Sequence, residues 1–137
     1  MTEETNFKSG YSEVNGLKMY YEIYGAGKPL VLIHGGGSTI ETSFGRIIPL
    51  LAKHRQIIAV ELQAHGHTND RHTDLTFEQD ADDVATLLNN LKIPNADFLG
   101  FSNGAHAAVE IALRHPGLIN KIILASGVYQ RNATVPQ

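Results

Sequence analysis

The sequence predicts an α/β protein with a mostly parallel, doubly wound sheet that starts with an antiparallel hairpin. Short apolar runs alternate with amphipathic stretches along the 137 residues, and an Asn-Gly pair joins the first two runs. Alternating strands and helices are typical of a parallel sheet with helices on both faces. We expect one domain over residues 1–137, with flexible ends at 1–9 and 130–137.

The N-terminal half supplies the hairpin and the first parallel strands. Strands are expected at 11–14, 17–24, 30–33 and 57–60. Asn15-Gly16 favours a tight primed turn, because both central residues of that turn need positive φ. The apolar run at 30–33 is typical of a parallel strand covered on both faces. Between the last two strands we expect a helix at about 43–53, with Pro49 restricting its path.

The C-terminal half contains the clearest helix, predicted at 76–92. Thr76 and Gln79 have the spacing of a capping box, and apolar residues recur every three or four positions after them. We interpret Asp80, Asp82 and Asp83 as a solvated face near the helix start, where the dipole favours negative charge. Further elements follow as a strand at 97–101, a helix at 103–115 and a strand at 121–125.

Composition excludes several classes of function. The net charge is −3, the pI is about 6.1 and no basic patch occurs, so we expect no nucleic-acid partner. No signal peptide or apolar run of transmembrane length is seen, so we expect no membrane partner. The chain has no cysteine, which fits a cytoplasmic location.

The motif Gly100-Phe101-Ser102-Asn103-Gly104 lies between a predicted strand and a predicted helix. This is the context of a nucleophile elbow, in which a sharp turn lifts a serine hydroxyl clear of the sheet. A Cβ at Gly100 or Gly104 would collide with the neighbouring helix or strand backbone. Ser102 is therefore the candidate nucleophile.

A second motif, His34-Gly35-Gly36-Gly37, follows the strand at 30–33. Acyl transfer needs hydrogen-bond donors for the oxyanion that forms on the attacked carbonyl. We expect these donors to be the backbone amides of Asn103 and Gly36, with Gly37 as the second choice in the loop. His34 and Gly35 are expected to support the shape of this loop.

Residues 11–128 resemble the N-terminal part of an α/β-hydrolase. The resemblance is carried by the hairpin at 15–22, the strand and glycine loop at 29–37, the serine motif, and the stretch at 61–68, which is similar to D-L-R-G-H-G-x-S. It implies serine hydrolysis of a carboxylic ester or related acyl bond in a small molecule, without a cofactor. Peptidase, lactonase and carbon–carbon hydrolase activities remain open. Epoxide hydrolases are disfavoured, since such relatives usually have Asp at the position of Ser102.

The family's acid and histidine follow the serine in the chain. After Ser102 the only histidines are His106 and His115, and no acidic residue follows Glu110. The resemblance therefore implies a domain truncated on its C-terminal side, with the acid and base beyond Gln137, and we expect the chain alone to be inactive or very weak. We do not expect His106 to act as the base, because the elbow points the serine away from its helix.

Histidines also lie in the loop at 61–75, where His65, His67 and His72 could suggest a metal site. They have no partner ligand at a defined helical spacing, so we predict no metal and interpret them as flexible loop polarity.

Two other functions remain open. One is a dinucleotide-binding domain, because three glycines follow a strand and Glu61 ends the next one, although Ile40 stands at the third fingerprint glycine. The other is a non-catalytic protein on the same scaffold. In a truncated sheet the strand at 121–125 would be an exposed apolar edge, so we also expect self-association there.

Overall fold

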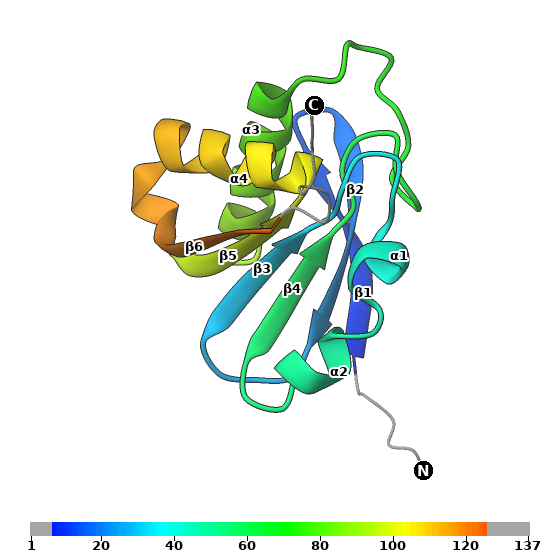
Figure 1. Ribbon diagram of the computed structural model, residues 1–137. Coiled ribbons are helices and arrows are strands. Elements are labelled where there is room, and N and C mark those ends of the chain that lie inside the picture. The colour runs from blue at the N-terminus through cyan, green and yellow to red at the C-terminus, as the bar shows by residue number, and fades with distance from the viewer. Residues whose placement is uncertain (1–6, 126–137) are drawn as a thin grey trace, which may run out of the picture.

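A computed structural model describes residues 7–125 (Figure 1). Its strands are β1 (Phe7–Val14), β2 (Leu17–Tyr24), β3 (Pro29–Ile33), β4 (Gln56–Val60), β5 (Ala96–Phe101) and β6 (Ile119–Ala125). Its helices are α1 (Ile40–Phe44), α2 (Ile48–Leu51), α3 (Phe77–Asn90), α4 (Asn103–Arg114) and the 3₁₀ helix η1 (Pro116–Leu118). None of these helices is both long enough and apolar enough to cross a membrane.

The strands form one sheet in the order β1-β2-β4-β3-β5-β6. β1 pairs antiparallel with β2, and β2 pairs antiparallel with β4. The remaining neighbours, β4-β3, β3-β5 and β5-β6, are parallel. Asn15 and Gly16 have φ of 51° and 83°, as a primed hairpin turn requires. The predicted fold class is confirmed.

Helices cover both faces of the sheet (Figure 1). On one face, α3 and α4 pack on inward side chains that include Val31, Ile58 and Phe98. On the other face, α1 and α2 pack on a second cluster that includes Leu32 and Ile57. Adjacent residues of one strand thus enter different cores, because successive side chains point to opposite faces. This explains why the central strands are apolar at nearly every position.

The prediction of one helix at 43–53 is wrong. Two short helices, α1 and α2, replace it, and α1 starts earlier, at Ile40. The Thr39 side chain accepts from the amide of Thr42, and the Thr42 side chain accepts from the amide of Thr39, forming a full capping box. Pro49 lies in the first turn of α2, where its missing N–H costs no helical hydrogen bond. Pro49 is therefore compatible with the start of a helix that begins at Ile48.

The flexible N-terminal segment predicted at 1–9 extends too far along the chain. Residues 7–9 belong to β1 and pair with Tyr24, Ile23 and Glu22. The predicted flexible end at 130–137 lies outside the described residues.

The solvated face predicted for the α3 aspartates holds for only one of them. Asp82 is partly exposed and pairs with Arg114 and His115. Asp80 and Asp83 are buried. Asp83 accepts from Arg71 at 2.9 Å, and this pair lies between α3 and the preceding loop. The helix dipole favours acidic residues in the first turn of a helix. It does not decide whether those residues face solvent or the core, so it could not predict the burial of Asp80 and Asp83.

β6 forms one edge of the sheet in the described part of the chain. Ile123 and Leu124 are 53% and 52% exposed, and the adjacent Ile122 is 36% exposed. Because neighbouring side chains alternate between faces, this strand exposes apolar surface on both sides. Such an edge is a template for pairing with another strand.

We expect the 137-residue chain to self-associate through β6. Replacement of Ile123 by Lys should weaken association about tenfold, because a charged side chain opposes edge-to-edge pairing and removes apolar contact. Light scattering over a concentration series measures the effect. Leu113→Lys is the matched control, since Leu113 is 71% exposed on α4. A monomer at high concentration, or equal effects of both variants, would contradict the prediction.

Candidate active site

The carboxyl ends of three parallel strands meet at one rim of the sheet. Ile33 at the end of β3 is in register with Val60 of β4 and with Gly100 of β5. The glycine loop, the loop that starts at Glu61 and the turn at Ser102 therefore leave the sheet side by side. Open α/β sheets bind ligands at this rim.

Ser102 has φ of 58° and ψ of −117°, an unusual conformation for a residue with a side chain. It lies between the last residue of β5 and the first residue of α4. Its amide donates to the carbonyl of Ala125 at 2.8 Å, which ties the turn to the neighbouring strand β6. Its side chain makes no capping bond to α4 and is half-buried. A strained turn of this kind holds the hydroxyl above the sheet.

The glycines at each end of the motif allow α4 to approach the sheet closely. A Cβ on Gly100 would lie less than 3.0 Å from the Gly104 carbonyl and the Ala105 Cα. A Cβ on Gly104 would lie equally close to the carbonyl oxygens of Ile33 and His34. The two predicted collisions are therefore confirmed: Gly100 faces the helix backbone and Gly104 faces the strand backbone.

The glycine loop contacts the serine turn directly. A Cβ on Gly35 would lie 3.4 Å from the Ser102 Cβ, and one on Gly36 would overlap the Asn103 side chain. Within residues 7–125, the amides of Gly36 and Asn103 donate to no protein acceptor. No acceptor in the described part of the chain occupies these two N–H groups, so they can donate to a ligand.

Gly37, the second choice in the loop, has its amide occupied. It donates at 3.0 Å to Nε2 of His65, whose Nδ1 lies 2.9 Å from the Gln63 carbonyl. Because Nε2 accepts, His65 is the neutral tautomer that donates from Nδ1. The sequence predicted His65 to be flexible loop polarity, but the ring holds the glycine loop against the loop after β4.

His34 is fully buried and fixes the other side of the same loop. Its Nε2 accepts from the Leu62 amide at 3.0 Å, and its Nδ1 lies 2.7 Å from the Gly35 carbonyl. Burial lowers the pKa of His34, and the opposing effect of the Gly35 carbonyl is smaller. The neutral ring also packs on His65, with centroids 4.8 Å apart. The His34 ring thus links the glycine loop to the loop after β4.

Glu61 has a buried carboxylate with three donors. It accepts from the Ile40 amide at 3.1 Å, from the His67 amide at 2.7 Å and from His67 Nδ1 at 2.9 Å. Burial raises the pKa of Glu61, but these hydrogen bonds outweigh it and hold the pKa below its usual value. Ile40 is the first residue of α1, so the Glu61 carboxylate accepts a hydrogen bond from the N-terminus of that helix. It is therefore not available to bind a ribose. This removes the main support for a dinucleotide-binding domain.

Neither histidine that follows the serine in the chain is placed as its base. His106 is exposed and stacks on Phe77, with ring centroids 5.0 Å apart. His115 contacts Asp82 at 2.7 Å. In the loop after β4, His67 stacks on Tyr20, while the exposed His72 is 3.9 Å from Asp70. Among residues 7–125, Ser102 thus lies beside two unoccupied amides and no histidine hydrogen-bonds to its side chain, while the nearby His34 and His65 hold the glycine loop.

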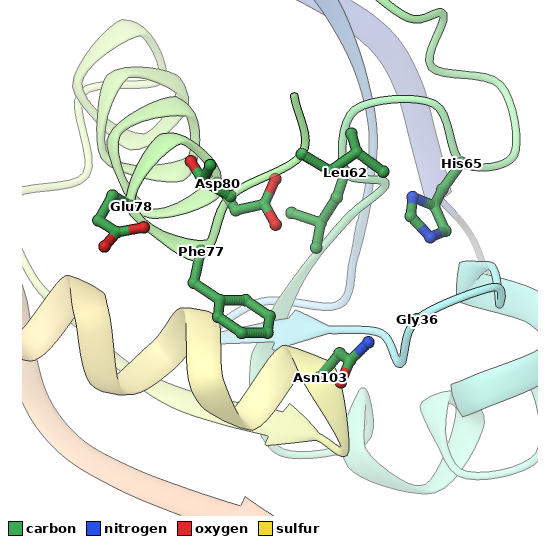
Figure 2. Close-up of a pocket in the computed structure, with 9 residues that line it drawn as sticks. Gly36, Leu62, His65, Phe77, Glu78, Asp80 and Asn103 are labelled. Carbon is green, nitrogen blue, oxygen red and sulfur yellow. The ribbon is translucent and has the colours of Figure 1, made fainter. Parts of the chain in front are cut away.

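A pocket of about 380 Å³ opens between α3, α4 and the two loops (Figure 2). It is lined by Gly36, Leu62, His65, Leu75, Thr76, Phe77, Glu78, Asp80 and Asn103. Gly36 and Asn103, which carry the two free amides, form part of its wall. The pocket thus adjoins the place where an acyl oxygen would bind.

Asp80 is a functional candidate that the sequence reasoning missed. Its carboxyl extends from α3 toward Leu62 (Figure 2), and the residue is only 9% exposed. Burial raises the pKa of Asp80 to about 7, helped by the charge of Asp83 and opposed by Arg71. A signal was available: Asp80 stands three residues after Phe77 and four before Val84, which places it on the apolar stripe.

Comparison with known proteins agrees with the fold. The family model for the alpha/beta hydrolase fold matches residues 28–137. Over 113 residues the chain is 33% identical to 2-hydroxymuconate semialdehyde hydrolase of Pseudomonas sp. strain CF600, covering 80% of this chain and 40% of that protein. It is 30% identical over 112 residues to pyrrolizixenacetamide deacetylase of Xenorhabdus hominickii, covering 82% and 42%.

Among solved structures, the enol-lactonase of Burkholderia xenovorans LB400 superimposes with a TM-score of 0.77 at 30% identity. The match covers 82% of this chain and 44% of the lactonase. The chain thus spans about two fifths of the length of these relatives.

Proposed function

Since the chain belongs to the alpha/beta hydrolase family, we propose that it supplies the nucleophile and the oxyanion site of a serine hydrolase. The substrate class is a small molecule with a carboxylic ester or related acyl bond. The single observation that supports this most is the strained Ser102 turn, set against a glycine loop with a free amide. The named relatives are hydrolases, one of which is called a deacetylase and another an enol-lactonase.

In this mechanism Ser102 Oγ gives its proton to a general base and attacks the carbonyl carbon of the substrate, and the leaving group departs with that proton as the acyl–serine bond forms. Negative charge then develops on the carbonyl oxygen, where the Gly36 and Asn103 amides donate hydrogen bonds. Loss of one such donor typically costs about a hundredfold to a thousandfold in rate. We assign the loop donor to Gly36 because the Gly37 amide is already bonded to His65. Residues 7–125 supply no hydrogen-bonded base to Ser102, so we expect the 137-residue chain by itself to be inactive or very weak.

A fluorophosphonate probe tests this proposal. Its phosphoryl oxygen occupies the same anion site as the carbonyl oxygen of an ester. We expect slow but selective modification of Ser102, about a hundredfold faster than at an ordinary exposed serine such as Ser9. Peptide mass spectrometry over a time course measures both rates, and Ser102→Ala should remove the main adduct.

Equal modification rates at Ser102 and Ser9 would contradict the proposal. That result would favour a non-catalytic protein on the same scaffold, a second candidate supported by the positions of His106 and His115, which contact Phe77 and Asp82 and make no hydrogen bond to Ser102 among the described residues. Rapid modification, complete within minutes, would show a fully activated serine and would contradict the inactivity of the chain alone.

A further inference from the structure

The Asp80 carboxyl is the one strongly buried acidic group that borders the pocket. No residue between 7 and 125 donates a hydrogen bond to it, although Asp83 on the same helix accepts from Arg71, Asn15 and Gln79. Asp80 is nine-tenths buried. Asp80 lines the pocket, and its oxygens are not among the fully enclosed atoms without a partner in the described residues, so they face accessible space and are available to a ligand there.

The rest of the lining favours a positively charged ligand group. Glu78 is a second acidic residue of the pocket, and no Lys or Arg among residues 7–125 lines it. His65 is neutral in the tautomer described above. The Phe77 ring borders the same space (Figure 2), and an aromatic face attracts cations. Leu62 and Leu75 add apolar surface for a short alkyl chain.

We propose that Asp80 binds a primary ammonium group of the ligand, which selects acyl substrates that carry a short aminoalkyl chain. The ammonium donates to the carboxylate at the α3 end of the pocket, while the acyl group reaches the Gly36 and Asn103 amides at the other wall. This inference deepens the proposed hydrolase function and rests on it, because the bound ammonium compound is a substrate only if Ser102 acts as a nucleophile. Binding of the ammonium itself does not depend on Ser102.

The charges around Asp80 determine how binding varies with pH. On α3 they are Glu78 and Asp83, from the preceding loop they are Arg71 and His65, and α4 presents His106 against Phe77. An ammonium binds the ionised carboxylate. Because the pKa of Asp80 is about 7, the ionised fraction increases between pH 6 and 8. Ligand affinity should therefore rise over this range.

The test is a titration of the 137-residue chain with n-butylammonium, with 1-butanol as the uncharged analogue. Amide chemical shifts of Phe77 and Asp80 in ¹H–¹⁵N spectra report binding. We expect n-butylammonium to bind more tightly than 1-butanol, and Asp80→Asn to weaken n-butylammonium about tenfold or more. Asp74→Asn is the matched control, and it should change affinity less than about threefold because Asp74 is exposed and does not line the pocket.

Three results would overturn the proposal. The first is an Asp80→Asn variant that binds n-butylammonium as tightly as the unmodified chain. The others are equal affinities of the unmodified chain for n-butylammonium and 1-butanol, or an n-butylammonium affinity that does not rise between pH 6 and 8. Asp80→Asn removes a buried charge beside Asp83, so we expect it to fold, and its dispersed spectrum is the check. Ser102→Ala should bind n-butylammonium as the unmodified chain does. Failure of fluorophosphonate labelling with normal ammonium binding would therefore reject only the hydrolase function.

Discussion

Gly104→Ala is expected to lower the free energy of unfolding by about 3 kcal/mol. The added methyl group would lie less than 3.0 Å from the carbonyl oxygens of Ile33 and His34. Both carbonyls belong to the end of β3 and the start of the glycine loop, where backbone cannot give way as a flexible side chain does. The intrinsic helix preference of Ala, about 1 kcal/mol over Gly, offsets only part of this collision.

Urea unfolding followed by circular dichroism measures this loss. Gly117→Ala is the matched control, because nothing lies within 4 Å of a Cβ at that position. It should change stability by less than about 0.5 kcal/mol. Similar stabilities for the two variants would show that α4 does not approach β3 as closely as described, and would remove the geometric basis for the site at Ser102.

Arg71→Met is expected to lower the free energy of unfolding by about 3–5 kcal/mol, because it leaves the buried Asp83 carboxylate without its positively charged partner. Asp83 is fully buried and Arg71 is 10% exposed. Arg71 also donates to Gln63 at 2.5 Å and to the Val14 carbonyl at 3.1 Å. One guanidinium thus joins the hairpin, the loop after β4 and α3. Thermal unfolding should show a much lower midpoint or no cooperative transition.

A second substitution separates charge from packing. In the double variant Arg71→Met, Asp83→Leu the buried charge is gone, so part of the lost stability should return. Arg114→Met is the control, because its pair with Asp82 is largely exposed and should contribute little. If the double variant is no more stable than Arg71→Met alone, the buried charge is not the cause of the loss.

Much of the fold could be predicted from local pattern. The hairpin turn follows from Asn15-Gly16, and the central strands follow from apolar runs whose residues alternate between the two cores. The region at 43–53 could not be predicted in this way. Pro49 is compatible both with a restricted helix and with the first turn of a new one, and the capping pair Thr39 and Thr42 decides between them.

In the candidate site, too, some features follow from the local sequence and others from tertiary contacts. The sequence by itself determined the serine turn and the glycine loop, because their constraint is steric and short-range: only glycine fits where backbones cross at Gly100 and Gly104. Tertiary structure alone decided that His65 occupies the Gly37 amide and that Asp80 borders a pocket. Those contacts join segments far apart in the chain, and hydrogen bonding and burial depend on which segments meet.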